Sequence, residues 1–588
     1  MEAANVFETD EQTPPTKNWI SSVRTANLTN TMMTNPKTYA VLGLGPSGLA
    51  AVKELVQQHA TKGQKVQVVG FDPSPRVGGK WAIIPRKDDS SSWSTASEVS
   101  GVWKEMCMND PRHYIEFSDF PWRKEDYNSK RDGTKGPLAD DLFGVFAHHT
   151  EAQLYLEAYA KHFGLNHHFR LNTKVVKVER APGISSNTGW LVYYQGTQSR
   201  RIDSAHFDVV VDCRGRYNVP KNPLVSWTRD GSAVLDNFTG KVLHSCDFDG
   251  VASFDGLRVL VVGHMASSSD IACALAKAEN TKRLVNVVRR IPMHMNRLSR
   301  VNKKIGYDAG MAGNRFITYL NRTLPMSLNM QGMQKKNLDI FPEQITAELS
   351  GDAQIARDPD ILVSGATYAV DYMEHYKAGR IVLKKNIVSV HGKQVTFEVG
   401  ASEEFDVIIC GTGYHCDFSV VPEQVQNQVR FSSHTGTEQA ALYLYTLVPD
   451  ICDYVFVGQH AGFGPNWPAL EMAARYVAAI FSGRIPRPCE STIRRGATAF
   501  QHYRTGGPEF IRQYDLSLVV QELLAEQLGV APSAWRALFW EPSKLLFSYP
   551  YSSYYRIHDD NPDVARQARV RWEELLAQHG KYYPADEL

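Results

Sequence analysis

Three glycines at residues 43, 45 and 48 have the spacing G-x-G-x-x-G between an apolar run and a helical pattern. The first glycine allows a tight turn, the second lets the backbone approach a pyrophosphate, and the third lets a helix pack closely on a strand. Asp72 ends the next apolar run, where a carboxylate can accept hydrogen bonds from a ribose. This combination predicts a site for FAD or NAD, and the acid excludes the 2′-phosphate of NADP here.

A second stretch, VVGHMASSSDIACALA at residues 261–276, repeats the order of apolar run, glycine and helical pattern. Gly263 keeps the first glycine, but Met265 and Ser268 stand where the other two glycines are usual. A side chain at 265 crowds a pyrophosphate, whereas a hydroxyl at 268 can bond a phosphate or cap the helix. The stretch is therefore either a second dinucleotide site or a turn that only holds a helix on a sheet.

Both turns need parallel sheets to hold them, and the surrounding patterns are of that kind. Strand, helix and strand patterns follow one another over residues 38–72, and a second such unit runs from LRVLVV to RLVNVV. Two units predict an α/β fold with two dinucleotide-binding, Rossmann-like domains. The expected division is a disordered tail at 1–37, a first nucleotide-binding domain in two segments at 38–220 and 401–483, a second at 221–400, and a C-terminal helical extension at 484–588.

The composition narrows the class of protein. The 588 residues carry a net charge of +1, which provides no basic surface for nucleic acid. No uncharged apolar run reaches the roughly 18 residues of a transmembrane helix, and the polar first 37 residues do not read as a signal peptide. The eight cysteines form no CxxC pair, so we expect reduced thiols, no metal site and a cytoplasmic protein.

Further motifs make the chain resemble the flavin-containing monooxygenases. RVGGKW follows Asp72 at 76–81, and MNDPRHYIEFSDFPW at 108–122 matches the family's Asn-x-Pro segment before Phe-x-Asp-Phe-Pro. FDVIICGTGY and GFGPNWPALEMAARYVAAIFSG come later in family order, so the resemblance covers about residues 38–483. The fingerprint F-x-G-x-x-x-H-x-x-x-[F/Y] is matched by Phe238, Gly240, His244 and Phe248.

The resemblance implies FAD at the first turn and NADPH at the second. In this family reduced FAD and dioxygen form a C4a-hydroperoxide, which transfers one oxygen atom to nitrogen or sulfur of a small organic molecule. The protein then has to position the reactants, exclude water and tune hydrogen bonds. Asn109 aligns with the active-site asparagine beside the flavin and is the candidate catalytic residue, although an asparagine before Asp-Pro can also be a turn residue.

Two other parts of the resemblance concern the linkers between the domains. His244 belongs to a linker in this family, so we expect a structural hydrogen bond rather than a catalytic base. Its motif ends in Phe248, where related Baeyer–Villiger enzymes carry tryptophan, and this favours oxygenation of a heteroatom. CGTGYHCDF at 410–418 returns the chain to the first domain, and the helix that begins at NWPALEM could face the flavin pyrimidine.

Arg289 and Arg290 follow the strand after the second turn, and no acid stands there. Guanidinium groups suit a 2′-phosphate, so we expect a working but weakened site that prefers NADPH to NADH. Three alternatives stay open: an oxidase that needs no NADPH, a Baeyer–Villiger-type oxygenase, and a flavin-bound scaffold without activity. The residues expected to bind FAD or NADPH are Gly43, Gly45, Pro46, Ser47, Gly48, Asp72, Gly79, Lys80, Trp81, Asn109, Asp110, Val175, Val176, Gly263, Ser267, Ser268, Ser269, Asp270, Arg289, Arg290 and Gly413.

Overall fold

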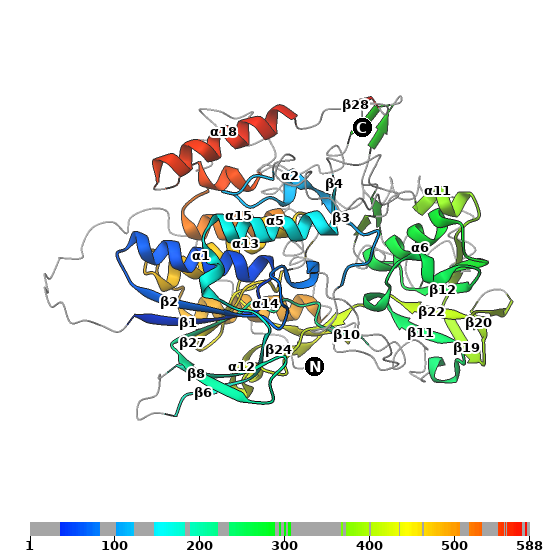
Figure 1. Ribbon diagram of the computed structural model, residues 1–588, viewed down its shortest axis with the longest axis horizontal. Helices are drawn as coiled ribbons and strands as arrows, with labels where there is room; N and C mark the ends of the chain where they lie inside the picture. Colours follow the sequence, from blue (N-terminus) through cyan, green and yellow to red (C-terminus); the bar gives the residue numbers. More distant parts are fainter. Residues whose placement is uncertain are drawn as a thin grey trace, which may run out of the picture. The chain divides into compact units, whose positions relative to one another are not determined.

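The structure is a computed structural model (Figure 1). It describes residues 36–82, 101–122, 146–182, 189–221, 234–288, 293–295, 299–301, 304–306, 366–368, 372–398, 401–433, 436–460, 462, 464–505, 517–531, 551–557, 559, 561–578 and 583–584. The described elements belong to one unit that begins at Lys37. Two sheets, the first mostly and the second entirely parallel, organise this unit, and each carries one of the two glycine turns.

The first sheet has six strands in the order β26-β27-β9-β1-β2-β5, and neighbours are parallel except for β26 and β27. Its strands come from the first part of the chain and from residues 447–456, so this sheet is discontinuous in sequence. They are Leu447–Val448 (β26), Ile451–Phe456 (β27), Val209–Asp212 (β9), Lys37–Leu42 (β1), Val66–Phe71 (β2) and Phe169–Arg170 (β5).

Helices cover this sheet with a continuous apolar core. Helix α1 starts directly after the first turn, because Pro46 presets the first helical φ and apolar residues recur at Leu49, Val52 and Leu55. It packs against α13, and α13 packs against α15, so a helix from beyond residue 484 contributes to the core of the first sheet. The helices are Pro46–Thr61 (α1), His149–His162 (α5), Asn466–Phe481 (α13) and Ser517–Leu528 (α15).

The second sheet is parallel throughout, with the strand order β11-β22-β12-β13-β18. Its strands are Lys241–His244 (β11), Val407–Cys410 (β22), Arg258–Val262 (β12), Arg283–Val288 (β13) and Val382–Lys385 (β18), and α6 (Ala266–Ala278) and α11 (Tyr372–Lys377) accompany it. Because β22 pairs between β11 and β12, this sheet includes residues beyond 400, and the domain boundaries expected from the sequence stay predictions.

Smaller elements connect and flank the two sheets. Two three-stranded antiparallel sheets are formed by β6 (Thr173–Arg180), β7 (Trp190–Gly196) and β8 (Ile202–Phe207), and by β19 (Ile387–His391), β20 (Gln394–Phe397) and β21 (Glu403–Glu404). Antiparallel pairs join β3 (Cys107–Pro111) to β4 (Phe146–His148), β10 (Val219–Pro220) to β23 (Tyr414–His415), and β24 (Arg430–Ser432) to β25 (Glu438–Ala440). Further short strands are β14 (Met293–Met295), β15 (Ser299–Val301), β16 (Lys304–Gly306), β17 (Ala366–Tyr368) and β28 (Tyr583–Pro584).

The four remaining described α-helices include two that lie beyond residue 484. They are α2 (Arg112–Ile115), α12 (Glu423–Val429), α14 (Glu490–Arg504) and α18 (Pro562–Gln578), with a 3-10 turn η9 at Ser552–Arg556. Among the described residues, no helix is long and apolar enough to cross a membrane. The α/β fold with two parallel, Rossmann-like sheets and a C-terminal helical segment confirms the fold class that the sequence predicts.

Candidate active site

The first turn connects β1 to α1, and the backbone itself requires two of its glycines. Gly43 has a φ of +91°, in the region that favours glycine, and a Cβ there would lie 3.0 Å from the carbonyl oxygen of Cys213. A Cβ on Gly48 would lie 1.9 Å from the carbonyl oxygen of Gly43. Helix α1 therefore packs this closely on β1 only because both positions are glycine.

Gly45 is different, because the fold does not require a glycine at this position. Its φ is −74°, and a Cβ would meet its nearest protein atom, the Cα of Gly79, at an ordinary contact distance of 3.5 Å. A glycine without a structural need, followed by Pro46 and Ser47 at the start of a 16-residue helix, fits the close approach of a pyrophosphate. The residues of this turn thus fit a bound dinucleotide.

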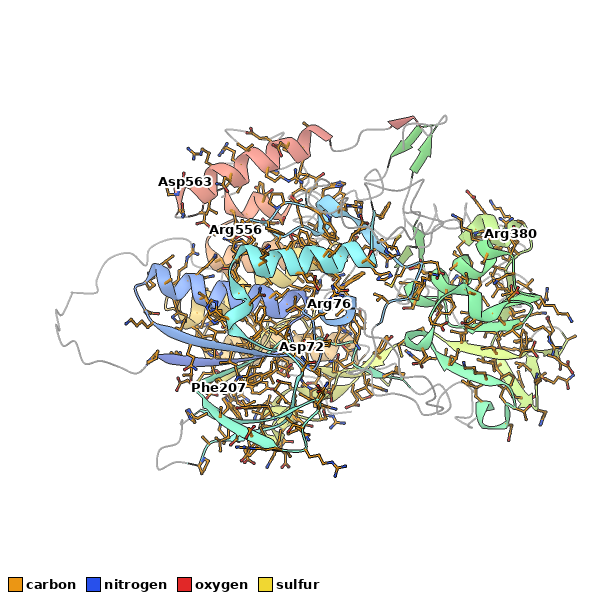
Figure 2. The ribbon with its side chains drawn as sticks, viewed as in Figure 1. Asp72, Arg76, Phe207, Arg380, Arg556 and Asp563 are labelled. Atoms are coloured by element: carbon orange, nitrogen blue, oxygen red, sulfur yellow. The ribbon has the colours of Figure 1, made fainter. Side chains whose placement is uncertain are left out.

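Asp72 follows β2 and ties the turn together from the neighbouring strand (Figure 2). Its carboxylate accepts hydrogen bonds from the backbone N–H groups of Leu44, at 2.7 Å, and Ser74, at 2.8 Å. Burial raises the pKa of Asp72, and these two backbone bonds oppose the rise. Each oxygen keeps a further lone pair, so the group remains able to accept a ribose hydroxyl. The sequence indicated only the ribose role.

The residues of GGKW lie directly on the first turn. A Cβ on Gly79 would lie 2.9 Å from the Cα of Gly45, so the two glycines are in close contact. Burial lowers the pKa of the neighbouring Lys80 to about 8. The Trp81 ring meets the Trp467 ring edge-on, with 6.0 Å between their centroids. This segment therefore joins the first turn to the start of α13.

Val175 and Val176 lie near the start of β6, in the three-stranded sheet. The strand is tied to the first site because the Thr173 N–H donates to the carbonyl oxygen of Asp72 at 2.9 Å. The pairing of β6 with β7 shifts between Val175 and Lys177, so Val176 is the irregular position. Their predicted contact with the cofactor stays a prediction.

Asn109 stands in β3, an antiparallel strand, and not in a turn. The preceding Met108 is buried in the core of the first sheet, and Pro111 ends the strand as the N-cap residue of α2. The turn interpretation of Asn109 is therefore wrong, because a strand anchored at both ends fixes its backbone. Asp110, which the sequence also assigned to cofactor binding, lies in the same strand.

The second turn repeats the backbone hydrogen bonds of the first. The Gly43 N–H donates to the carbonyl oxygen of Phe71 at 2.8 Å, and the Gly263 N–H donates to that of Val287 at 2.9 Å. Cys213 and Gly411 likewise bond the last residues of β1 and β12, each at 2.8 Å. The two turns therefore have the same framework, and they can be compared position by position.

Met265 occupies the place of Gly45 and has nearly the same backbone conformation. Its φ and ψ are −92° and −178°, against −74° and −170° for Gly45. Its side chain is 44% exposed at the N-terminus of α6. The methionine therefore leaves the turn undistorted and places its thioether at the position that the glycine leaves open in the first turn.

The hydroxyls of Ser268 and Ser269 lie against backbone carbonyl oxygens, and the predicted contact of these two residues with the cofactor stays a prediction. Ser268 is 1% exposed, and its hydroxyl lies 3.4 Å from the carbonyl oxygens of Val262 and Gly411. Ser269 is also buried, and its hydroxyl donates to the carbonyl oxygen of His264. Both point toward the sheet, because the third and fourth residues of α6 form its packing face. Ser267 and Asp270 are partly exposed, while Arg289 and Arg290 lie outside the described residues.

The sheet accommodates Ser268 because the facing residue lacks a side chain. A Cβ on Gly411 would lie 1.8 Å from the Ser268 hydroxyl and 3.0 Å from its Cβ. In the first turn the arrangement is reversed, since a Cβ on Gly48 would face the side chain of Cys213. Each turn thus has one side chain in the gap between its helix and the following strand, contributed from opposite sides.

We expect Gly411→Ala to lower the free energy of unfolding by about 1–3 kcal/mol, because it overpacks this gap. Ser268→Gly in the same chain should restore most of the loss, since it removes the side chain that clashes. Urea unfolding of the two single variants and the double variant measures the coupling between the two positions. Strict additivity of the two changes would contradict the packing argument.

His244 and Gly413 connect the two linkers. The Nε2–H of His244 donates to the carbonyl oxygen of Gly413 at 3.1 Å, and its Nδ1 accepts from the Cys246 N–H at 3.2 Å. Burial lowers the pKa of His244 to about 4, so the ring is neutral at ordinary pH. The Gly413 carbonyl also accepts from the Lys221 N–H. These contacts support the structural role expected for His244, and they show Gly413 as a junction of the linkers.

Helix α13 begins at Asn466, whose side-chain oxygen accepts from the Gly462 N–H at 3.1 Å. The loop before it lies against the first turn, because a Cβ on Gly458 would lie 2.5 Å from the Ser47 hydroxyl. The N-termini of α1 and α13 therefore approach the same region. Their positive dipole ends suit the phosphates and the reduced ring of a flavin dinucleotide.

Two polar clusters near these sites were not predicted from the sequence. Arg556 inserts into buried carboxylates of the first sheet's helices, and Asn286 forms hydrogen bonds beneath the second turn. Neither cluster follows a local motif, because its members come together only through tertiary packing. A buried Asn in the middle of the apolar run RLVNVV was the single available signal.

Comparison with known proteins identifies the class that these two sites define. The chain matches the Flavin-binding monooxygenase-like family over residues 36–569. Flavin-containing monooxygenase 5 of Cavia porcellus is 23% identical over 537 residues, 89% of each chain. Dimethylaniline monooxygenase [N-oxide-forming] 2 of Oryctolagus cuniculus is 25% identical over 535 residues, which cover 89% of this chain and 88% of the relative.

Solved structures agree with this fold. S-allyl-L-cysteine S-oxygenase from Allium sativum superimposes with a TM-score of 0.56 at 22% identity, over 92% of this chain and 99% of the other. Cyclohexanone monooxygenase with bound ε-caprolactone gives a TM-score of 0.53 at 17% identity, over 84% of this chain and 99% of the other. These likenesses show that the chain shares the fold of these proteins.

The chain belongs to the flavin-binding monooxygenase-like family. It is an oxidoreductase with FAD and NADPH as its cofactors, and the resemblance drawn from the sequence motifs is confirmed.

Proposed function

We propose that the protein transfers one oxygen atom from dioxygen to a nitrogen or sulfur atom of a small organic molecule. NADPH supplies a hydride, which is two electrons and one proton, and solvent supplies a second proton. The second oxygen atom leaves as water, and the products are the N- or S-oxide and NADP⁺. Bound FAD supplies the activation of dioxygen. The observation that carries this proposal is the pair of turns with matching backbone hydrogen bonds, of which the first leaves Gly45 open for a dinucleotide.

The first turn holds FAD in this proposal. Gly45 admits the pyrophosphate to the start of α1, and Asp72 accepts a ribose hydroxyl while its two backbone bonds keep the carboxylate in place. Trp81 and Gly79 close the turn on the side of α13. The helix N-termini of α1 and α13 stabilise negative charge in the region between them.

The second turn holds NADPH, with Met265 beside the pyrophosphate. Because the methionine does not distort the backbone, only its side chain opposes binding, and a flexible thioether can turn aside at modest cost. Arg289 and Arg290 supply the preference for a 2′-phosphate. The result is a site that works with a raised KM for NADPH.

Asn109 is the proposed catalytic residue. Its strand is fixed by the burial of Met108 and by the pairing of β3 with β4. An uncharged amide can donate a hydrogen bond where dioxygen is activated without supplying an acidic proton that would divert the oxygen to hydrogen peroxide. One relative is named as an N-oxide-forming monooxygenase, and one structural neighbour is named as an S-oxygenase. These names support nitrogen and sulfur as the acceptor atoms.

The test combines product analysis with a variant. Wild-type protein with NADPH and a panel of tertiary amines, sulfides and cyclic ketones should form N- or S-oxides, and Asn109→Leu should raise the hydrogen peroxide released per NADPH by about 2- to 10-fold. Asn166→Ala, at an exposed position of the first domain, serves as the control and should leave the ratio unchanged. Esters from the ketones would favour a Baeyer–Villiger enzyme, and flavin reduction by substrate without NADPH would favour an oxidase.

A further inference from the structure

Beneath the second turn, one buried amide makes four hydrogen bonds. Asn286 of β13 is 0% exposed, and its Nδ2 donates to the carbonyl oxygens of Val261, at 2.9 Å, and Gly263, at 2.7 Å. Its Oδ1 accepts from the His264 Nδ1–H at 2.7 Å and from the Tyr372 hydroxyl at 2.6 Å. Every donor and acceptor of the amide is therefore used.

The arrangement fixes the orientation of each member. Carbonyl oxygens accept hydrogen bonds only, so the NH₂ group of Asn286 must face Val261 and Gly263. Its oxygen then faces His264, whose Nδ1 must carry the proton. Burial lowers the pKa of His264 to about 4, which keeps this ring neutral, and the Tyr372 ring packs edge-on against it at 4.7 Å.

The first turn fills the same positions with apolar groups. Gly43 and Gly263 donate to Phe71 and Val287, respectively, so Leu44 corresponds to His264 and Gly70 corresponds to Asn286. Leu44 packs over Gly70 so closely that a Cβ on Gly70 would lie 2.6 Å from it. Thus a Leu–Gly contact beneath the first turn is replaced beneath the second by a His–Asn hydrogen bond.

The two turns also differ in what holds them from the neighbouring strand. Asp72 bonds the Leu44 N–H in the first turn, whereas Asn286 bonds the Gly263 carbonyl and the His264 ring in the second. Gly263 and His264 directly precede Met265, so the amide holds the residues that set the direction of the methionine and of the first N–H groups of α6.

We infer that Asn286, with His264 and Tyr372, is a positioning cluster that keeps the second turn in a shape competent for NADPH despite the loss of two glycines. This inference rests on the proposed use of NADPH at that turn. The cluster does not touch the reacting atoms. It acts through the backbone of residues 263–265, and its effect should appear in the binding of the nicotinamide cofactor rather than in the later oxygen chemistry.

The main variant is Asn286→Leu, which keeps a similar volume and removes all four hydrogen bonds. In the FAD-loaded protein we expect the Kd for NADP⁺ and the KM for NADPH to rise by about tenfold or more, with kcat at saturating NADPH and the FAD content nearly unchanged. Tyr372→Phe removes one bond and keeps the ring, so its rise should be smaller. An unchanged KM, or a fall in kcat alone, would overturn the inference.

A second variant guards against simple misfolding. The combination His264→Leu, Asn286→Gly and Tyr372→Phe copies the Leu–Gly contact of the first turn and removes the polar side-chain groups of the cluster together, so that none of these three side chains is left with a buried group lacking its partner. It should recover most of the NADP⁺ affinity that Asn286→Leu loses. If the combined variant binds NADP⁺ no better than Asn286→Leu while both proteins remain folded, support of the turn does not explain the loss of affinity, and the inference is contradicted.

Hydrogen–deuterium exchange separates this inference from the proposed function. In FAD-loaded protein without NADPH, Asn286→Leu should speed exchange of the amides at 263–269 by about tenfold, while those at 43–48 keep their wild-type rates. If this exchange difference is seen but the wild-type protein binds no NADP⁺, the proposed use of NADPH is refuted and the positioning role of Asn286 is not. Equal exchange at 263–269 in both proteins would refute the positioning role whatever the cofactor result.

Discussion

Arg556→Ala is expected to lower the free energy of unfolding of the FAD-loaded protein by about 3–5 kcal/mol, because it leaves buried carboxylates without their cation. Arg556 lies in η9 of the C-terminal segment and is 7% exposed at its side chain (Figure 2). Its Nη2 lies 2.5 Å from Glu54, 3.3 Å from Asp119 and 3.2 Å from Glu471.

The charges of this cluster are balanced by residues from distant parts of the chain. Lys53 is paired with Glu54 and Asp119, and burial lowers the pKa of the nearby Arg475 to about 10. Although burial opposes it, the neighbouring cations lower the pKa of Glu54. Three carboxylates that lie close enough to hold a metal ion face the cations Lys53, Arg475 and Arg556. Arg556 also pairs with Asp559, so removing Arg556 leaves a net buried negative charge.

Urea unfolding at neutral pH, followed by tryptophan fluorescence, measures the loss. Arg566→Ala is the matched control, since Arg566 lies in the adjacent α18 and forms an exposed pair with Asp563. It should change the free energy of unfolding by less than about 0.5 kcal/mol. A comparable effect of both variants would show that the C-terminal segment is stabilised by general packing and not by the buried charges.

This cluster also marks the limit of what the sequence could predict. Arg556 and Glu54 are 502 residues apart in sequence, and no local pattern links an arginine in SSYYR to a glutamate inside an apolar helix. Burial of charged groups depends on which helix faces which, and α1, α13 and η9 meet only in the folded chain. The sequence predicted a C-terminal helical segment, but it offered no reason for its attachment.

The glycine turns were predictable to different degrees for a physical reason. The first turn is specified by neighbouring residues, because the φ of Gly43 and the contact of Gly48 with Gly43 are local. The direction of the Ser268 side chain could not be predicted, because it depends on Gly411, which directly follows a strand far along the chain. The place of Asn109 in a strand likewise depends on β4, which follows it at residues 146–148.

Gly48→Ala is expected to abolish FAD retention and to destabilise the protein even without cofactor. A Cβ at this position would lie 1.9 Å from the carbonyl oxygen of Gly43, and backbone cannot turn aside as a side chain can. The Gly43 N–H is itself bonded to Phe71, so the strand end is held on its other side. Alanine improves helix propensity by about 1 kcal/mol, but overpacking against fixed backbone reaches about 3 kcal/mol or more and outweighs that gain.

Gly45→Ala is the matched comparison, because it adds the same methyl group in the same turn. Here the Cβ has 3.5 Å to the nearest protein atom and φ is negative, so the apoprotein should keep its free energy of unfolding within about 0.5 kcal/mol. Its bound FAD, measured by flavin absorbance after gel filtration, should nevertheless fall, since the methyl group occupies the pyrophosphate approach. If Gly45→Ala keeps its full FAD content, the dinucleotide does not bind at this turn. If the Gly48→Ala apoprotein is as stable as the wild-type apoprotein, the fold does not require a glycine at residue 48. The two variants together therefore separate a glycine needed by the fold from a glycine needed by the cofactor.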